Sequence, residues 1–137
     1  MKNQINREKI LALIREFLHG EKEIIFAYAY GSFLKDKEFR DIDLGIFLKN
    51  AGENPYVITS QIKVALSQQA KKQGLYLPPD CWDVQIINQA PFTFLGRIFK
   101  EGKLLLDRNP DLRTDIIEKV SLKYRECAGL LAEAALL

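Results

Sequence analysis

One apolar segment constrains the fold more than any other part of the sequence. Residues 24–30 are all isoleucine, phenylalanine, alanine or tyrosine, and such a run predicts a buried strand. Side chains alternate along a strand, so the aromatic residues share one face and the alanines share the other: Phe26, Tyr28 and Tyr30 against Ala27 and Ala29. Because alanine is small, a helix can pack closely on the second face. The segment therefore predicts a strand within a sheet, with a helix against its alanine face.

The rest of the chain predicts an α+β fold and a single domain, residues 1–137. Apolar residues recur at helical spacing in some segments and alternate in others. In chain order we expect a helix, two strands, a helix, a strand, a short helix, a short edge strand and a last helix: residues 6–19, 23–30, 42–48, 54–73, 82–88, 91–102, 104–106 and from about 110 onward. This order is typical of a small mixed β-sheet whose helices gather mainly on one face.

Composition and charge narrow the class of function. Twenty basic and 18 acidic residues leave a formal net charge of +2, which is too small to indicate a nucleic acid or an anionic membrane as the partner. We therefore expect no direct nucleic-acid binding. The polar residues 1–9 lack the apolar stretch of a signal peptide, and no apolar run approaches the roughly 20 residues that span a membrane.

The few thiol and imidazole side chains indicate a cytoplasmic protein without a zinc site. Cys81 and Cys127 are far apart, and His19 is the only histidine, so the spacings that supply four zinc ligands are missing. Two cysteines without a secretory signal favour a reducing compartment. We expect both to be buried apolar residues.

Three aspartates form the first half of a candidate site. Asp41 and Asp43 flank Ile42 at the start of the second expected strand, so their carboxylates would point to one face. Carboxylates held side by side repel each other unless a cation lies between them, and magnesium takes oxygen ligands while keeping positions open for phosphates. Asp83 lies in the apolar run of the third strand, where a lone charge is costly to bury. If that strand neighbours the second, Asp83 would lie beside Asp43 on the same face.

Gly31 and Ser32 form the other half of this candidate site. They end the first strand, and a turn into a helix there would expose backbone N–H groups and a hydroxyl, which suit a phosphate oxygen. Glycine and serine are also common in ordinary turns. In combination with the aspartates, however, they favour displacement at the α-phosphate of a nucleotide, with metal ions that neutralise the developing charge.

The same residues resemble a known signature. Tyr30-Gly31-Ser32 followed by Asp41-Ile42-Asp43-Leu44 is similar to the Gly-Ser-x(n)-Asp-x-Asp motif of the DNA polymerase β-type nucleotidyltransferase superfamily, and the short length points to its minimal members. The segments 82–88 and 98–105, with Pro91 between them, resemble the MntA-like antitoxins that pair with HEPN-domain toxins. The similarity covers roughly residues 22–125.

This resemblance implies a specific activity. Asp41, Asp43 and Asp83 would hold Mg2+, and Gly31 and Ser32 would bind the triphosphate of ATP. AMP would be transferred to a tyrosine of a HEPN-domain toxin, whose ribonuclease activity is thereby silenced. The loop of eight residues between Ser32 and Asp41 is shorter than is usual in this motif. The basic residues of the loop, Lys35 and Arg40, would neutralise the triphosphate or belong to a solvated charged loop.

Two other functions are compatible with the same core. The chain could be a catalytically silent module that neutralises its partner by binding alone. It could also nucleotidylate a small molecule such as an antibiotic, although such enzymes usually carry a second substrate domain, for which we see no room here. The three aspartates favour catalysis, because a silent module has no need of carboxylates that destabilise one another.

The end of the last expected helix predicts a contact with another chain. Residues 127–137 contain a single charged side chain, and apolar residues wrap most of the circumference of the helix. The segment is either buried within its own domain or pairs with another molecule. We expect an interface, either with a HEPN toxin or with a second copy of this protein as a homo-oligomer.

Overall fold

The apolar segment of residues 24–30 forms β1 (Ile24–Tyr30), an inner strand of a mixed sheet. Its companions are β2 (Ile42–Leu48), β3 (Trp82–Ile86) and β4 (Lys103–Asp107). The sheet order is β3-β2-β1-β4; β1 pairs antiparallel with β2 and β4, and β2 pairs parallel with β3. The expected small mixed sheet is confirmed. The structure, a computed structural model, describes residues 2–52 and 54–135, and the side chains of residues 7–52 and 54–129.

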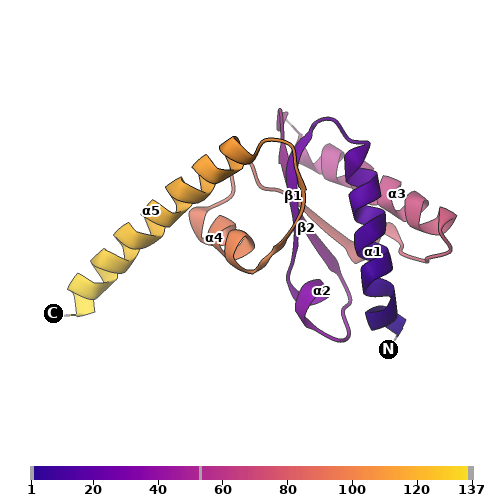
Figure 1. Ribbon diagram of the computed structural model, residues 1–137, viewed down its shortest axis with the longest axis horizontal. Coiled ribbons are helices and arrows are strands. Elements are labelled where there is room, and N and C mark those ends of the chain that lie inside the picture. Colours follow the sequence, from indigo (N-terminus) through magenta and orange to yellow (C-terminus); the bar gives the residue numbers. More distant parts are fainter. Residues whose placement is uncertain (1, 53, 136–137) are drawn as a thin grey trace.

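Helices cover both faces of this sheet. α1 (Lys2–His19), α2 (Ser32–Lys35) and α3 (Pro55–Lys72) pack on the alanine face, where Ala27 and Ala29 are fully buried (Figure 1). α4 (Phe92–Glu101) covers the aromatic face, and its Ile98 lies in one buried cluster with Phe26 and Tyr28. The larger helical layer is on one face, as expected. α4 covers the other because the aromatic side chains there must also be shielded from water.

The expected elements are present, with shifts at their ends. α1 begins at Lys2 rather than at residue 6, and β3 ends at Ile86 rather than at residue 88. The Asn88 side chain nevertheless extends the pairing: the N–H of Leu48 donates to its Oδ1 at 2.9 Å, and its Nδ2 donates to the Leu48 carbonyl at 2.8 Å. A side chain therefore replaces backbone at the end of the ladder. The loop expected near residue 79 contains a short 3-10 helix, η1 (Pro79–Cys81).

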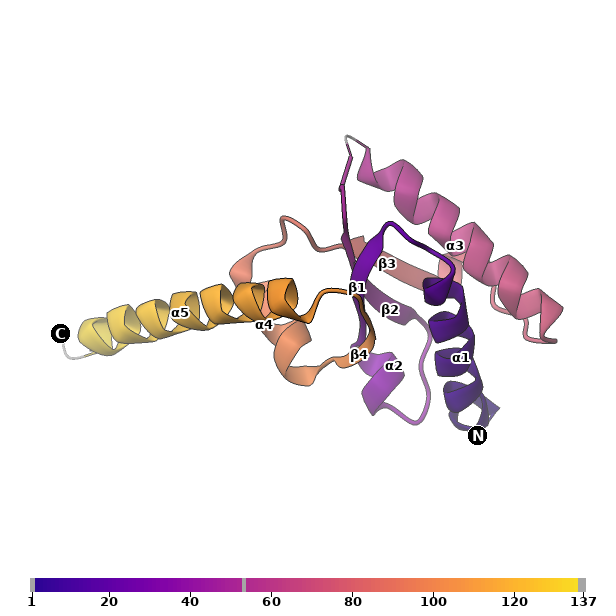
Figure 2. The same cartoon turned by 45° about the horizontal axis from the view of Figure 1, so that its top comes forward.

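The last helix, α5 (Pro110–Ala135), extends away from the sheet on the side of α4 (Figures 1 and 2). The start expected near residue 110 is confirmed. The Tyr124 hydroxyl donates to the Thr93 carbonyl at 2.9 Å, and its ring meets Phe92 edge-on with 5.4 Å between centroids. Most of the apolar segment predicted to form an interface, residues 130–137, lies outside the described side chains. That residues 1–137 form one domain stays a prediction.

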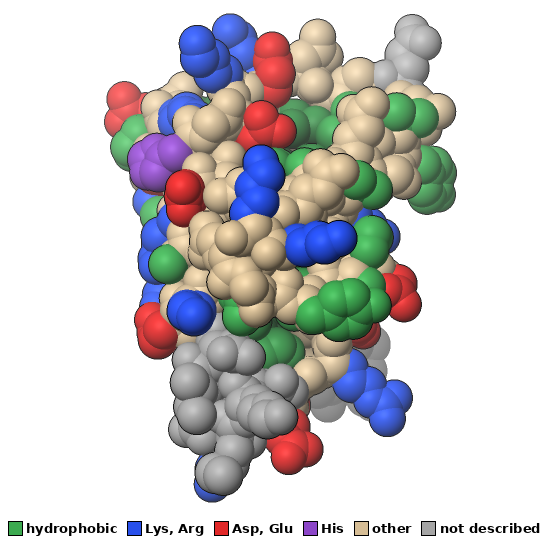
Figure 3. Space-filling view, turned by 90° about the vertical axis from the view of Figure 1, so that its right-hand side faces the viewer, with side chains coloured by type: hydrophobic (Ala, Val, Ile, Leu, Met, Phe, Trp, Pro, Cys, Tyr) green, Lys and Arg blue, Asp and Glu red, His purple; other side chains and the backbone are tan. Residues whose placement is uncertain are grey.

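The outer face of the α1 and α3 layer carries charges of both signs. Acidic and basic side chains are interspersed there with each other and with hydrophobic side chains (Figure 3). Among the described residues, no helix combines the length and the apolar character that crossing a bilayer requires.

Candidate active site

The register of three strands brings the central residues of the candidate site into one row. Asp43 of β2 lies in the middle of this row: it pairs with Tyr30 of β1 on one side and with Asp83 of β3 on the other. Residues paired across a sheet point to the same face. The expectation that Asp83 lies beside Asp43 is therefore confirmed, and both carboxyl groups lie on the face that α4 partly covers.

The Asp43 carboxyl group keeps its proton to a higher pH than an ordinary aspartate does. The pKa of Asp43 is raised from 3.8 to about 6, first by burial, then by the hydrogen bond that its protonated form donates to Asp83, and then by the negative charges of Asp83 and Asp41. Gln85 Nε2 donates to Asp83 Oδ1 at 3.0 Å and so orients that carboxylate. The pair is therefore a place where added positive charge is stabilising.

The turn after β1 lies directly against this pair. Gly31 has a φ of 77° and a ψ of −157°, a conformation that essentially only glycine adopts. A Cβ added to Gly31 would lie 2.4 Å from Asp43 Oδ2, so no larger residue fits without moving the carboxylate. Ser32 then begins α2, as the expected turn into a helix requires.

Asp41 occupies a different position from the other two aspartates. It is exposed and precedes β2, whose first paired residue is Ile42. Strand pairing therefore does not fix its carboxylate on the face of Asp43. Its charge still reaches the site, because it contributes to the raised pKa values of Asp43 and of Cys81, the latter about 11 and caused chiefly by burial and by Asp80. Within the described residues, no three acidic, histidine or cysteine side chains are grouped as a metal site.

The two basic residues predicted to bind the nucleotide lie on the loop that follows Ser32. Lys35 ends α2, and its Nζ lies 3.3 Å from Glu101 Oε2 at the end of α4. Both side chains of this ion pair are largely exposed, so the pair is weak. Arg40 is exposed at the end of the loop. The structure therefore shows both residues on the segment between Ser32 and Asp41, and their role in phosphate binding stays a proposal.

One residue that supports this loop was not found by sequence reasoning. Arg7 of α1 donates from Nε to the Phe33 carbonyl at 2.7 Å and from Nη2 to the Asp36 carbonyl, and its guanidinium lies 5.5 Å from the centre of the Phe39 ring. An arginine near a helix start carries no local signal of such a contact, because its partners lie more than 25 residues away.

Tyr30 connects the carboxyl pair to α4. Its ring meets Phe94 edge-on with 5.6 Å between centroids. Burial raises the pKa of the Tyr30 hydroxyl, and the charges of Asp83 and Asp43 raise it further. Tyr28, by contrast, is buried in the core and accepts a hydrogen bond from Arg113 Nη1 at 2.9 Å. Tyr28 therefore belongs to the core, whereas Tyr30 borders the site.

Sequence comparison places this geometry in a known family. Residues 13–111, well over half of the chain, match the family described as polymerase beta, nucleotidyltransferase. The chain belongs to that family. Members generally use divalent metal ions, and the raised pKa of Asp43 fits such an ion, because a cation would relieve the repulsion from Asp83 and Asp41 that contributes to it. No curated protein sequence matches the chain.

Solved structures of this nucleotidyltransferase fold include toxin–antitoxin complexes. A chain of the complex of tri-AMPylated Shewanella oneidensis HEPN toxin with MNT antitoxin matches with a TM-score of 0.54 at 16% identity, covering 98% of this chain and 99% of that chain. A toxin–antitoxin structure with AMP-PNP matches with a TM-score of 0.57 at 17% identity, covering 96% and 99%. The MntA–HepT toxin–antitoxin matches with a TM-score of 0.52 at 16% identity, covering 98% and 99%. At these identities the likeness concerns the fold.

Proposed function

We propose that this protein is an adenylyltransferase antitoxin that uses ATP and Mg2+ to attach AMP to a tyrosine of a HEPN-domain toxin in the cytoplasm. The observation that carries the proposal is the Asp43–Asp83 carboxyl pair, packed against the Gly31 turn in a chain of the nucleotidyltransferase family. The complexes of the same fold supply the choice of acceptor, because one of them contains a tri-AMPylated HEPN toxin and another contains AMP-PNP.

Each site residue has a role in this proposal. Asp41, Asp43 and Asp83 hold Mg2+, which would neutralise the negative charge of the triphosphate and the charge that develops during transfer. Gly31 and Ser32 bind the β- or γ-phosphate through the turn and the Ser32 hydroxyl. The remaining residues, Lys35 and Arg40, supply positive charge from the loop. Lys35 can exchange Glu101 for a phosphate at little cost, because their ion pair is exposed.

The proposed reaction exchanges one bond for another at phosphorus. The tyrosine oxygen of the acceptor forms a bond to the α-phosphorus of ATP, the bond from that phosphorus to the bridging oxygen breaks, and pyrophosphate leaves. The phenolic proton is released. The chain's own contribution is to hold the phosphates and the acceptor in line.

The carboxyl pair also argues against a module that acts by binding alone. Asp43 is held beside Asp83 although burial and like charge both disfavour its ionised form. Such an arrangement destabilises the fold, and a binding surface does not require it. Use of the pair as a cation site explains why the repulsion is tolerated.

The test is an AMP-transfer assay with α-labelled ATP, MgCl2 and purified HEPN-domain toxins, the Shewanella oneidensis toxin among them. We expect label on a toxin tyrosine with the wild-type protein. The Asp43→Asn variant should label nothing, because it removes a metal ligand. Ser32→Ala should slow transfer by about 3- to 10-fold, which corresponds to one hydrogen bond of about 0.5–1.5 kcal/mol.

Two results would contradict this assignment. Undiminished labelling by the Asp43→Asn protein would exclude the carboxyl pair as the metal site. A wild-type protein that is not thermally stabilised by ATP with MgCl2, and that labels no toxin, would show that the chain is not an adenylyltransferase.

A further inference from the structure

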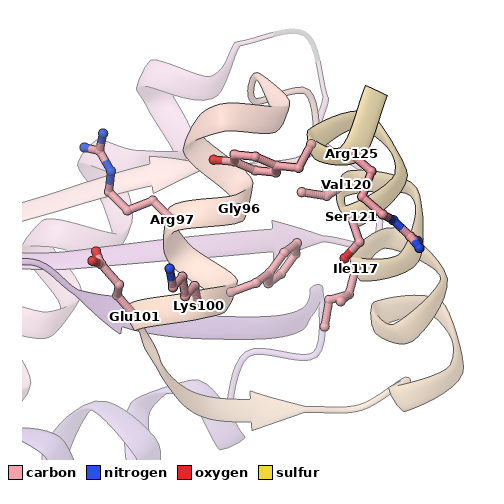
Figure 4. A pocket seen from close by; sticks show the side chains of 10 residues that line it. Gly96, Arg97, Lys100, Glu101, Ile117, Val120, Ser121 and Arg125 are labelled. Atoms are coloured by element: carbon pink, nitrogen blue, oxygen red, sulfur yellow. The ribbon is translucent and has the colours of Figure 1, made fainter. Parts of the chain in front are cut away.

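A cleft lies between α4 and α5. It has a volume of about 800 Å3. Phe99 of α4 and Ile117 and Val120 of α5 give it an apolar floor (Figure 4). A second hollow of about 460 Å3 lies along the other flank of α5 and includes Phe92 and Leu122. Apolar surface is therefore open on both sides of α5.

The rims of both hollows are mainly basic. Four basic and one acidic side chain flank them: Lys100 and Arg125 in the first, and Lys119 and Lys123 with Glu126 in the second. Arg97 and Glu101 also line the first hollow but project from α4 on the side away from α5 (Figure 4). Glu101 is also paired with Lys35, which offsets its charge. An apolar floor between basic rims is complementary to a helix with one apolar face and acidic flanks.

The cleft is preformed by a close contact between the two helices. A Cβ added to Gly96 would lie 2.0 Å from Tyr124 Cε2, so the absence of a side chain at Gly96 admits the tyrosine ring. The Tyr124 hydroxyl donates to the Thr93 carbonyl at 2.9 Å. Together these contacts set the spacing of α4 and α5. Leu122, which lines the second hollow, is 52% exposed.

α4 links the cleft to the candidate active site. Phe94 of α4 packs on Tyr30, the strand partner of Asp43. Arg97 and Glu101 project from α4 on the side away from α5 (Figure 4), and Glu101 reaches Lys35 of α2. A molecule bound between α4 and α5 would therefore contact the same helix that packs on the strand partner of Asp43.

From these observations we infer that the α4–α5 cleft is the docking site for the acceptor protein, which inserts an amphipathic helix with acidic flanks. This inference rests on the proposed transfer of AMP to a protein. Apolar contacts with the floor supply affinity, and the basic rims select an acidic partner and orient it. Docking there brings the acceptor to α4, the helix that packs on Tyr30, and requires no contribution from the carboxyl pair to binding.

The test measures peptide binding to the full-length protein by fluorescence anisotropy. Two labelled helical peptides of about 18 residues, roughly 27 Å long, share a leucine stripe and carry either glutamate or lysine at all other positions. We expect the acidic peptide to bind at least about tenfold more tightly than the basic one. The double variant Lys100→Glu with Arg125→Glu should lose about tenfold in affinity for the acidic peptide. Ile117→Ser, in the apolar floor of the cleft, should weaken binding of both peptides.

A matched control separates the cleft from overall charge. Lys71→Glu with Lys72→Glu makes the same change of charge at the exposed end of α3, on the opposite face of the sheet. This variant should bind the acidic peptide as the wild type does. Equal peptide affinities for the cleft and control variants would overturn the inference. A wild-type protein that sediments as a dimer, while the cleft variant sediments as a monomer, would show that a second copy fills the cleft and would overturn it as well.

The same variants distinguish this inference from the proposed function. Asp43→Asn should abolish AMP transfer and leave peptide affinity unchanged, whereas the cleft variant should bind ATP with MgCl2 normally and transfer AMP to the toxin slowly. Peptide selectivity without any wild-type transfer contradicts the proposed function and supports the cleft. Transfer at the wild-type rate by the cleft variant contradicts the docking site and leaves the proposed function standing.

Discussion

Gly31, Asp43 and Asp83 show how single residues determine the geometry of the candidate active site. The turn at Gly31 lies so close to Asp43 Oδ2 that a side chain would collide with it, and Asp43 is in turn hydrogen-bonded to Asp83. A change at any one of the three therefore alters the other two. The close approach of Gly31 to Asp43 and the raised pKa of Asp43 each lead to a prediction about stability.

Replacing Gly31 by alanine should destabilise the fold by more than the backbone conformation alone explains. Gly74→Ala is the matched control, because Gly74 also has a positive φ, 78°, but has no atom within 4 Å of an added Cβ. We expect Gly74→Ala to lower the free energy of unfolding by about 1 kcal/mol and Gly31→Ala to lower it by at least about 2 kcal/mol. Urea unfolding measures both. Equal losses would show that the contact with Asp43 is relaxed at no cost.

The raised pKa of Asp43 predicts a dependence of stability on pH. The folded-state pKa of about 6 lies above the ordinary value of 3.8, so the folded protein holds an extra proton between these values, and stability is lost as the pH rises through this window. The Asp43→Asn variant has no carboxyl group to ionise at this position, so it does not lose stability in this pH window. The variant should match the wild type near pH 4 and exceed it above pH 6 by on the order of 1 kcal/mol, after allowance for solvent screening.

Urea unfolding at a series of pH values, without nucleotide or metal, measures this difference. Asp115→Asn on the exposed part of α5 is the control for the loss of one negative charge. If the difference in stability between Asp43→Asn and wild type is as large at pH 4 as at pH 7, the pKa of Asp43 is not raised.

At the scale of secondary-structure elements, two arginines connect segments that are distant in the sequence. One binds the loop after β1, and the other binds the C-terminal end of α1. Arg7 bonds to carbonyls of the α2 segment, and Arg108 donates to four carbonyls around the end of α1: Leu18, His19, Glu21 and Ile24. The last carbonyls of a helix lack partners within the helix. Arginine side chains supply those partners here.

Loss of Arg7 should affect nucleotide binding more than folding. The Arg7→Ala variant frees the segment 33–39, which carries Lys35 and follows Ser32 directly. We expect the apparent KM for ATP to rise by about 3- to 10-fold with a smaller change in kcat. Arg7→Lys should restore little, since an ammonium group does not replace the planar fork. An unchanged KM in both variants would limit Arg7 to a structural role.

Loss of Arg108 should instead lower stability without affecting nucleotide binding. Arg108→Ala leaves the carbonyls at the end of α1 without their charged donor, and we expect a loss of about 1 kcal/mol in the free energy of unfolding. Thermal or urea unfolding detects this loss. The shift in melting temperature on addition of ATP with MgCl2 should equal that of the wild type, because Arg108 lies outside the candidate site.

At the scale of the whole molecule, α5 separates into a packed part and a projecting part. Val120 is buried against the rest of the protein, whereas Ala128 and Gly129 are exposed and an added Cβ at Gly129 would meet no atom within 4 Å. The sheet and the candidate site lie at the other end of this helix (Figure 2).

Deletion of residues 128–137 should therefore leave the fold and the binding of ATP with MgCl2 largely intact while weakening association with a partner. Circular dichroism melting and analytical ultracentrifugation measure the two effects. An unfolded truncated protein would place the segment in the core. A folded truncated protein that associates as fully as the intact chain would place the interface elsewhere, with the α4–α5 cleft as the next region to examine.

The sequence by itself determined the order of the elements and the faces on which Asp43 and Asp83 lie; the structure added that β2 and β3 are neighbours. The order and the faces both depend on local periodicity. Alternation along β1 placed Ala27 and Ala29 on the face that α1, α2 and α3 cover. Alternation along β2 and β3 placed the two aspartates on one face of the sheet, because these strands are neighbours. The resemblance of residues 30–44 to a nucleotidyltransferase motif led to the same family as the full comparison. The roles of the site residues stay proposals.

Only the tertiary structure decided where the long charged side chains go and what lies beside the site. Lys35 pairs with Glu101, 66 positions further along the chain (101 − 35), and Arg7 of α1 donates to the carbonyl of Phe33 in the loop after β1. Gly96 admits Tyr124 and so shapes the α4–α5 cleft. Contacts of this kind depend on the packing of separate elements and on flexible side chains with several possible partners. No local pattern in the sequence encodes them, because the partners become neighbours only when the sheet and its helices have assembled.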